Sequence, residues 1–151
     1  MQTAAKVIHP FNASLKWNEE AHIGIINSGR RAQIVFTTPP EFGGSQTEWS
    51  PEHLLAASIS SCYTTTFCHF IKLMKVKVNS FQLDITMDVE KDGAEPFTVT
   101  RYVLHPRIEF AGNPGQNVID NLLSRAKRYC IISNSVKGEV IVEPEIKFAA
   151  A

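Results

Sequence analysis

The feature that most constrains this chain is a change of hydrophobic period near residue 80. Residues 51–75 contain no proline or glycine after Pro51, and one apolar stripe recurs at intervals of three and four residues, at Leu55, Ile59, Cys62, Thr66 and Phe70. Residues 81–90 instead alternate between apolar and polar side chains without exception. The first period is that of a helix with one buried face, and the second is that of a strand with one buried face. The sequence therefore predicts a long helix followed by a half-buried antiparallel strand.

The residues around position 50 predict where this helix begins. Ser50 is a good N-cap, Pro51 suits the first helical position, and the Glu52 carboxylate suits the positive end of the helix dipole. The preceding segment, residues 38–45, holds two prolines and two glycines, which cannot continue a strand ladder. We therefore expect a loop that leads directly into the helix.

The remaining segments complete an α+β pattern. Short β segments are predicted within residues 5–37, and residues 97–110 are predicted to pair with the strand at residues 81–90. A second helix follows residues 113–115 and carries one apolar face, at Val118, Leu122, Ala126 and Cys130. A closing strand carries alternate apolar residues, at Val140, Val142, Ile146 and Phe148. Because the predicted hairpins cluster and the helices are separate from them, an α+β fold is favoured over a doubly wound sheet. We expect residues 1–151 to form one domain.

Composition and charge narrow the class of protein. Fifteen Lys and Arg residues balance fifteen Asp and Glu residues, which argues against a dedicated nucleic-acid binder. The five histidines show no metal-ligand spacing, and no run approaches the ~18 uninterrupted apolar residues of a membrane span. The first residues lack a signal-peptide pattern, and three cysteines are an odd count for a disulfide scaffold. We expect a cytoplasmic protein without a nucleic-acid or membrane partner and without a bound metal.

The cysteines have two open interpretations. Cys62 lies on the apolar stripe of the long helix, and Cys130 lies on the inner face at the end of the second helix. Each is either a small buried hydrophobe or part of a thiol site, and the two are placed to meet. Cys68 is about 9 Å along the helix from Cys62 and some 240° around it. That relation is too distant for a disulfide, so Cys68 is expected to be structural.

Three segments resemble motifs of one known family. Residues 49–62, Trp-Ser-Pro-Glu-His-Leu-Leu-Ala-Ala-Ser-Ile-Ser-Ser-Cys, look like the helix motif of the OsmC/Ohr family of osmotically inducible and organic-hydroperoxide-resistance proteins. Residues 130–134 are similar to its second-cysteine motif, Cys-Pro-Val/Ile-Ser-Asn, with Ile131 in place of the proline. Residues 38–44 resemble the loop before the helix in the hydroperoxide-resistance branch. The order of elements matches from about residue 10 to the end of the chain.

The resemblance implies a thiol peroxidase that reduces alkyl or lipid hydroperoxides. In this family Cys62 would be the peroxidatic nucleophile, and Cys130 would resolve its sulfenic acid as a disulfide. An external dithiol, of the lipoyl type in part of the family, would then reduce the disulfide, with no bound cofactor. The resemblance also implies an OsmC-like fold, in which an antiparallel sheet surrounds a long central helix and an intertwined homodimer holds the sites at its interface.

The family activates its nucleophile with an arginine held by a glutamate at the position of Glu52. Only about 3% of a free thiol is ionised at pH 7, so a site of this kind needs a positive potential. Glu52 lies ten residues before Cys62, about 15 Å away along the same helix, so it cannot touch the Cys62 of its own chain. It can approach the Cys62 of a second subunit if the two long helices pack antiparallel. The alternative is a first-turn carboxylate that stabilises the helix dipole.

The matching arginine is absent from its usual segment. Residues 19–22, which correspond to that segment, contain no arginine, and the candidates are Arg30, Arg31 and Arg101. Arg30 and Arg31 lie in a turn, where a solvated pair is the alternative. Arg101 either shares an inward strand face with Val99 or sits at a bulge and extends to solvent.

Two other functions fit the same residues. A non-catalytic OsmC-like dimer would bind an apolar small molecule or act as a redox sensor, with Cys62 in the pocket wall. A purely structural or partner-binding domain would leave Cys62 with an ordinary thiol pKa near 8.5.

Overall fold

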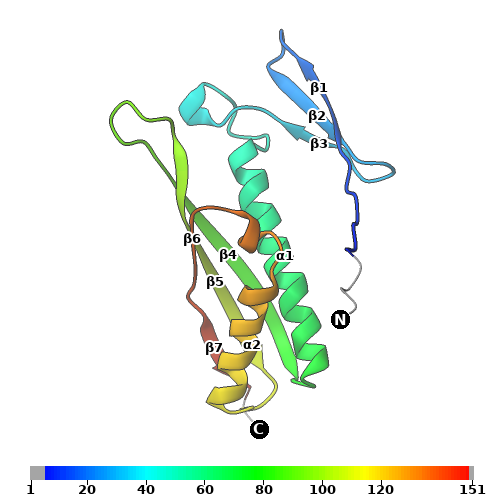
Figure 1. The fold of residues 1–151 in the computed structure, drawn as a ribbon, viewed down its shortest axis with the longest axis vertical. Coiled ribbons are helices and arrows are strands. Elements are labelled where there is room, and N and C mark those ends of the chain that lie inside the picture. The colour runs from blue at the N-terminus through cyan, green and yellow to red at the C-terminus, as the bar shows by residue number, and fades with distance from the viewer. Residues whose placement is uncertain (1–5, 150–151) are drawn as a thin grey trace. The chain divides into compact units, whose positions relative to one another are not determined.

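The computed structural model describes residues 6–149, which form two compact units. The first unit extends to Leu54 and the second begins at Leu55, inside the long helix. Each unit is described by itself, and Figure 1 shows the elements along the chain.

The first unit is built on a three-stranded antiparallel sheet. Its strands lie in sequence order, β1 (Ser14–Asn18), β2 (Ile23–Asn27) and β3 (Ile34–Phe36). The loop that follows contains a short 3-10 turn, η1 (Pro40–Phe42), which ends at Gly43 with φ of 83°. A Cβ atom on Gly44 would lie 1.6 Å from the Thr38 carbonyl oxygen, so the chain can pass there only as glycine. The predicted β segments and loop are therefore confirmed.

Helix α1 (Pro51–Leu73) begins where the sequence predicts. The His53 backbone N–H donates to the Ser50 hydroxyl at 3.3 Å, and the same hydroxyl contacts His53 Nδ1 at 2.8 Å. Ser50 is buried, so its side chain satisfies an N-terminal amide that water cannot reach. The predicted N-cap is confirmed.

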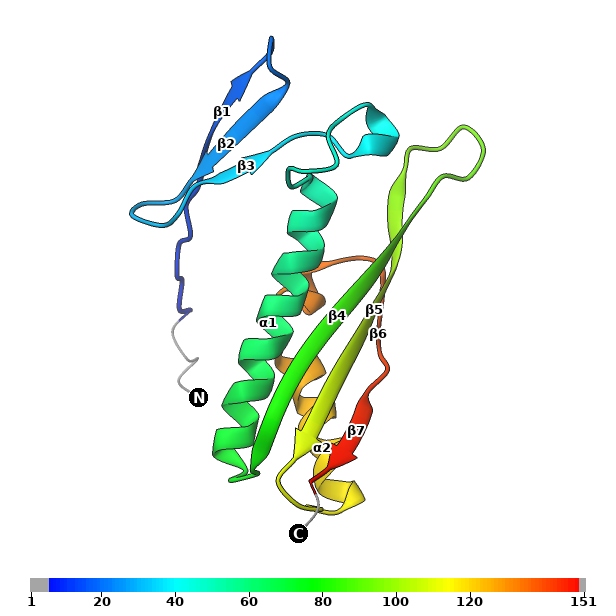
Figure 2. The same ribbon diagram turned by 180° about the vertical axis from the view of Figure 1, so that it is seen from behind.

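The second unit packs two helices on one face of a four-stranded sheet (Figures 1 and 2). The sheet contains β4 (Val78–Glu90), β5 (Thr98–Phe110), β6 (Glu139–Val142) and β7 (Glu145–Phe148). Helix α2 (Gln116–Tyr129) connects β5 to β6 and runs antiparallel to α1. This arrangement confirms the α+β class, with the long helix lying lengthwise against the sheet.

The sheet is mixed, which corrects the prediction that it is antiparallel. Strands β4 and β5 are antiparallel, but β6 and β7 both pair with β5 in parallel. The reason is the crossover through α2, because a strand, a helix and a second strand return the chain in its original direction. The predicted closing strand is also divided into β6 and β7 by Glu143 and Pro144, since proline cannot donate to the ladder.

The core lies between the helices and β5. Its fully buried side chains come from all three elements, at Ile59, Tyr63, Phe67, Phe70, Tyr102, Leu104, Ile108, Phe110, Ile119, Leu122, Ala126 and Cys130. On α1 the buried stripe is centred on Tyr63 and Phe67, and Phe67 stacks on Phe81 with ring centroids 4.5 Å apart. The predicted stripe through Cys62 and Thr66 is therefore rotated, because the large aromatic rings occupy the space next to the sheet. Cys62 lies at the margin of the core and is only half-buried.

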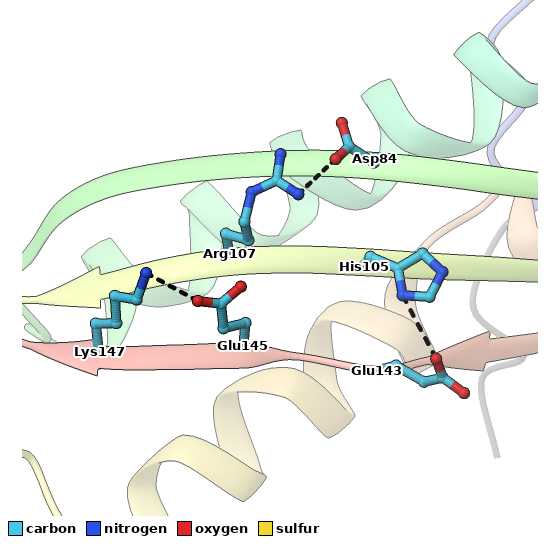
Figure 3. Close-up of polar contacts among 6 residues, drawn as sticks. All are labelled: Asp84, His105, Arg107, Glu143, Glu145 and Lys147. Carbon is cyan, nitrogen blue, oxygen red and sulfur yellow. Dashed lines mark ion pairs between the residues drawn. The ribbon is translucent and has the colours of Figure 1, made fainter.

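Ion pairs cover the outer face of the sheet. Arg107 pairs with Asp84 at 2.5 Å, His105 Nδ1 lies 3.4 Å from Glu143, and Lys147 pairs with Glu145 at 2.8 Å (Figure 3). Their side chains are exposed to solvent, so each pair contributes little to stability. The charged residues instead show that this side of the sheet is the polar face, which carries the polar residues of the alternating β4 sequence.

Helix α1 is unusually apolar for its degree of burial. An 18-residue window of α1 has mean hydropathy 1.2 and only 22% of it is buried, so by length and composition the helix is able to cross a membrane. A core helix passes the same test, which makes this weak evidence for a span. Most of the remaining apolar side chains of α1 are half-buried, and among them only Leu73 is an exposed large hydrophobic residue, whereas the sequence predicts a largely buried helix.

The aromatic contact between α1 and the sheet is expected to dominate the stability of the second unit. Phe67→Ala removes a fully buried ring, and we expect the free energy of unfolding to fall by about 3–5 kcal/mol. Leu73→Ala on the same helix is the control, because Leu73 is 61% exposed and its loss is expected to cost about 0.5 kcal/mol or less. Urea titration followed by circular dichroism measures both values, and equal losses for the two variants would contradict this packing.

Candidate functional site

The structure brings Cys62 and Cys130 together. Cys62 lies in the middle of α1, and Cys130 is the residue at which α2 ends, with extended backbone at φ −70° and ψ 107°. Both cysteines are free, and the Cys62 thiol lies near enough to Cys130 to raise the pKa of the Cys130 thiol. Antiparallel packing of the two helices therefore brings the two cysteines close together.

The two thiols differ in their surroundings. Cys130 is fully buried, whereas Cys62 is only half-buried. Burial raises the pKa of the Cys130 thiol, and the hydrogen bond and charge of Cys62 raise it further. The Ser133 hydroxyl, which donates to Cys130 Sγ at 3.0 Å, opposes the rise in pKa because it favours the thiolate. Cys130 is therefore held as a protonated thiol, and Cys62 is the more accessible sulfur.

A short turn after α2 fixes Cys130. The Cys130 backbone N–H donates to the Lys127 carbonyl at 3.3 Å, and the Asn134 N–H donates to the Cys130 carbonyl at 3.1 Å. The Asn134 side chain also donates to the Arg128 carbonyl at 2.8 Å, which satisfies one of the terminal carbonyls of the helix. The 3-10 turn η2 (Ser133–Ser135) then points Ser133 at the sulfur. The Ser-Asn pair of the second-cysteine motif thus has a direct structural role.

Ile131 stands where the related motif has proline. It is 73% exposed and follows Cys130 at the surface, while Ser133 and Asn134 hold the turn from its other end. The turn therefore forms without the proline.

Hydroxyl groups of α1 bond to the helix backbone next to Cys62. Thr66 donates to the Cys62 carbonyl at 2.8 Å, and Thr65 donates to the same oxygen at 3.0 Å. Three further hydroxyls bond in the same manner, those of Ser60, Ser61 and Thr64. Because these polar groups are satisfied within their own helix, they leave the Cys62 sulfur in largely apolar surroundings.

Tyr63 is a site residue that the sequence analysis did not identify. Its ring is fully buried, and its hydroxyl has no hydrogen-bond partner among residues 6–149. Burial raises the pKa of Tyr63 far above its ordinary value, and the charge of Cys130 adds to the rise. The available signal is its spacing, because Tyr63 follows Ile59 by four residues and precedes Phe67 by four on the core face.

Glu52 lies in the first turn of α1, ten residues before Cys62. That separation corresponds to about 15 Å along a continuous helix, so the two side chains of one chain do not meet. The Glu52 Oε2 atom is buried and accepts no hydrogen bond from the part of the chain that the structure describes. A buried carboxylate oxygen that accepts no hydrogen bond is costly, so Glu52 requires a hydrogen-bond donor from outside the described residues.

Arg101 is not part of the cysteine site. A bulge in the β4–β5 ladder pairs Val89 with Val99 and Asp88 with Arg101, which leaves one extra residue between them on β5. Of the two alternatives for Arg101, the structure therefore confirms the bulge with a solvent-exposed side chain and contradicts an inward face shared with Val99. Its guanidinium lies on the outer face, 2.7 Å from Asp88, with its side chain 53% exposed.

Arg30 and Arg31 lie in the exposed turn between β2 and β3 of the first unit. Arg31 donates to the Ser28 carbonyl at 3.2 Å, as expected of a solvated turn residue. Within residues 6–149 no group of three or more His, Cys, Asp or Glu side chains is arranged to hold a metal ion.

Comparison with known proteins identifies the family. A family model described as OsmC-like protein matches residues 43–145, which is more than half of the chain. The chain belongs to this family. Among its relatives, an organic hydroperoxide resistance protein-like 2 from Staphylococcus epidermidis is 23% identical over 132 residues, which cover 81% of this chain and 91% of that protein.

Solved structures confirm the fold of this OsmC-like protein. An OsmC-like protein of unknown function from Vibrio cholerae superposes with a TM-score of 0.83 at 21% identity, covering 91% of this chain and 100% of that one. An organic hydroperoxide resistance protein from Elizabethkingia anophelis gives a TM-score of 0.74 at 20% identity, covering 96% and 100%. At these identities the likeness shows the fold alone.

The hydrogen bond from Ser133 provides a test of the site's electrostatics. Ser133→Ala removes a donor that favours the thiolate, so the pKa of Cys130 is expected to rise further. Ser135→Ala is the matched control, because that hydroxyl donates to the Ile131 carbonyl and not to sulfur. The pH dependence of Cys130 alkylation, followed by peptide mass spectrometry, reports the pKa. An unchanged profile in Ser133→Ala would contradict the assigned contact.

Proposed function

We propose that this OsmC-like protein is a thiol peroxidase that reduces organic hydroperoxides. The observation that carries the proposal is the proximity of the accessible Cys62 to the buried, protonated Cys130. Two free cysteines close together on facing helices are the arrangement needed for a reversible disulfide. Relatives named organic hydroperoxide resistance proteins support this choice of chemistry.

The first step is attack by the Cys62 thiolate on the terminal oxygen of the hydroperoxide. The O–O bond breaks, an S–O bond forms, and the alkoxide leaves and takes up a proton to become the alcohol. Cys62 becomes a sulfenic acid, so sulfur is oxidised by two electrons and the peroxide is reduced by two. Cys62 takes this role because it is the more exposed sulfur of the pair.

The second step closes the disulfide. The Cys130 sulfur attacks the Cys62 sulfenic acid, an S–S bond forms, and hydroxide leaves with the Cys130 proton as water. Burial raises the pKa of the Cys130 thiol and so disfavours a charged sulfur there, whereas the disulfide that forms carries no charge. An external dithiol, of the lipoyl type by family resemblance, then reduces the disulfide to two thiols and becomes oxidised itself.

The active form is a homodimer in this proposal. Two features support it: the buried Glu52 oxygen lacks a donor among the described residues, and most apolar side chains of α1 are only half-buried. A second copy, packed with its α1 antiparallel, brings Glu52 of one chain toward Cys62 of the other. Glu52 would then hold the cation that favours the Cys62 thiolate, a role that Arg101 does not fill.

Organic hydroperoxides are the proposed substrates in preference to hydrogen peroxide. Cys62 lies at the edge of an apolar core, and an alkyl group gains free energy from burial there while a small polar oxidant does not. The three free cysteines and the thiol cycle fit a reducing compartment, so we place the protein in the cytoplasm.

A second candidate function retains the fold without turnover. The half-buried apolar side chains of α1 also suit a dimer that binds an apolar small molecule or senses oxidants through Cys62. Native mass spectrometry that shows a copurified ligand, together with no disulfide after oxidant treatment, would favour this alternative.

The roles of the three cysteines predict distinct variants. Cys62→Ser is expected to reduce turnover of cumene hydroperoxide to the uncatalysed background, because the nucleophile is lost. Cys130→Ser is expected to complete one turnover and stop as a sulfenic acid, which dimedone traps. Cys68→Ser is the control and is expected to behave as wild type. A dithiol-coupled peroxidase assay measures all three, and full activity in Cys62→Ser would exclude the proposed nucleophile.

The dimer proposal predicts both a mass and an activity. Sedimentation equilibrium is expected to give about twice the 16.8 kDa of the chain. Glu52→Gln is expected to lower kcat/KM for cumene hydroperoxide about tenfold, the effect of a rise of about one unit in the pKa of the nucleophile. Glu41→Gln, at an exposed carboxylate of the first unit, is the control. A stable monomer with full activity would refute the proposed site.

A further inference from the structure

Tyr63 places a hydroxyl group on an otherwise hydrocarbon face of α1. The buried residues of this helix are Ile59, Tyr63, Phe67 and Phe70, and Tyr63 alone among them has a polar side-chain atom. The residue is 0% exposed, so solvent does not reach the hydroxyl. A phenylalanine would fill nearly the same space, as Phe67 does one turn later, without burying a polar group. The hydroxyl therefore destabilises the packed core unless it gains a partner at some stage of the protein's work.

The Tyr63 hydroxyl makes no hydrogen bond within residues 6–149. Glu52, Tyr63 and Thr100 are the three residues of that range with a buried side-chain oxygen that lacks a partner, and only Tyr63 is itself a buried residue. A phenol is a hydrogen-bond donor, and in the unfolded chain water would accept its hydrogen. The Tyr63 hydrogen is therefore free to turn toward an acceptor that forms during a reaction.

Tyr63 lies close to the second cysteine of the site. Tyr63 and Cys130 belong to the same buried core, and the hydroxyl is near enough to Cys130 for a negative charge on that sulfur to raise the pKa of Tyr63. Burial is the larger cause of that rise in pKa, and the charge on Cys130 is the second. Because both causes favour the protonated phenol, Tyr63 stays a hydrogen-bond donor at neutral pH and does not act as a base.

The Cys130 sulfur becomes a better acceptor when it loses its proton. A neutral thiol is a weak acceptor, whereas a charged acceptor forms a hydrogen bond about twice as strong as a neutral one. One donor is already in place, because the Ser133 hydroxyl donates to Cys130 Sγ at 3.0 Å. Burial nevertheless raises the pKa of the Cys130 thiol, so the thiolate needs further stabilisation before it can attack. A second donor inside the core would supply it.

We infer that the Tyr63 hydroxyl donates a hydrogen bond to the Cys130 sulfur as the thiol loses its proton, and so speeds closure of the disulfide. The Cys130 S–H bond breaks, its sulfur attacks the Cys62 sulfenic acid, the S–S bond forms, and hydroxide leaves and takes up the proton as water. Tyr63 keeps its own proton throughout. The inference rests on the proposed peroxidase function and adds a residue to its second step, while the first attack on the peroxide does not involve Tyr63.

The first test is Tyr63→Phe, which removes only the hydroxyl. Rapid quenching after mixing with cumene hydroperoxide, followed by peptide mass spectrometry, times the sulfenic acid and the disulfide separately. Sulfenic acid formation is expected at the wild-type rate, and disulfide closure is expected to slow about tenfold. Tyr102→Phe is the matched control, because Tyr102 is a buried tyrosine whose pKa is raised by burial without a contribution from Cys130. Closure at the wild-type rate in Tyr63→Phe, or equal slowing in both variants, would overturn the inference.

A titration of Cys130 alone separates this inference from the proposed function. In Cys62→Ser, the pH dependence of Cys130 alkylation reports the pKa of the Cys130 thiol without any peroxide chemistry. Adding Tyr63→Phe is expected to raise that pKa by about one unit, because a donor to the thiolate is lost, and adding Tyr102→Phe is expected to leave it unchanged. Circular dichroism verifies that the variants fold.

The two proposals can then fail independently. A higher pKa of Cys130 in Cys62→Ser/Tyr63→Phe supports the hydrogen bond even if the wild-type protein reduces no peroxide. An unchanged pKa of Cys130, together with an active wild-type peroxidase, would reject the role of Tyr63 and leave the proposed function intact.

Discussion

The packing of the aromatic face of α1 against β5 determines the rest of the second unit. Tyr63 and Phe67 occupy the space next to the sheet and are completely buried. Because these rings take the centre of the helix face, Cys62 is left at its edge, where it is half-buried and still part of the packed structure. The α2 crossover between β5 and the parallel β6 then ends at Cys130, next to that edge. The proximity of the two cysteines is thus a consequence of how the core packs.

Unequal burial gives two chemically identical side chains different properties. Cys130 is enclosed by the core, so burial raises the pKa of its thiol, while Ser133 supplies a partly opposing hydrogen bond. Cys62 is the more accessible of the two cysteines. A peroxide that approaches from solvent would therefore meet Cys62 before Cys130. In the proposed cycle, the buried thiol of Cys130 would then resolve the oxidised Cys62.

Sequence patterns predicted the elements of this structure better than their three-dimensional relations. The alternation in β4 and the Ser50 cap are local features, so the strand over residues 81–90 and the start of α1 followed from nearest neighbours alone. The approach of Cys130 to Cys62 also followed from the inward faces of two helices. The parallel pairing of β6 did not, because it depends on a partner distant in the sequence, and for the same reason the bulge beside Arg101 was only one of two open alternatives. Tyr63 was missed because the stripe through Cys62 has the same helical spacing as the stripe through Ile59, Tyr63 and Phe67, so spacing alone does not decide which face meets the sheet.

The central claim is that Cys62 and Cys130 form one redox pair in which Cys62 reacts first. The most direct test is non-reducing peptide mass spectrometry after brief exposure of the protein to sub-stoichiometric cumene hydroperoxide. We expect a disulfide between Cys62 and Cys130 within seconds, with Cys68 still a thiol and no cross-link in Cys62→Ser. Cysteines that remain thiols, or that oxidise slowly to sulfinic acid without a cross-link, would contradict the claim and show that the fold persists without this chemistry.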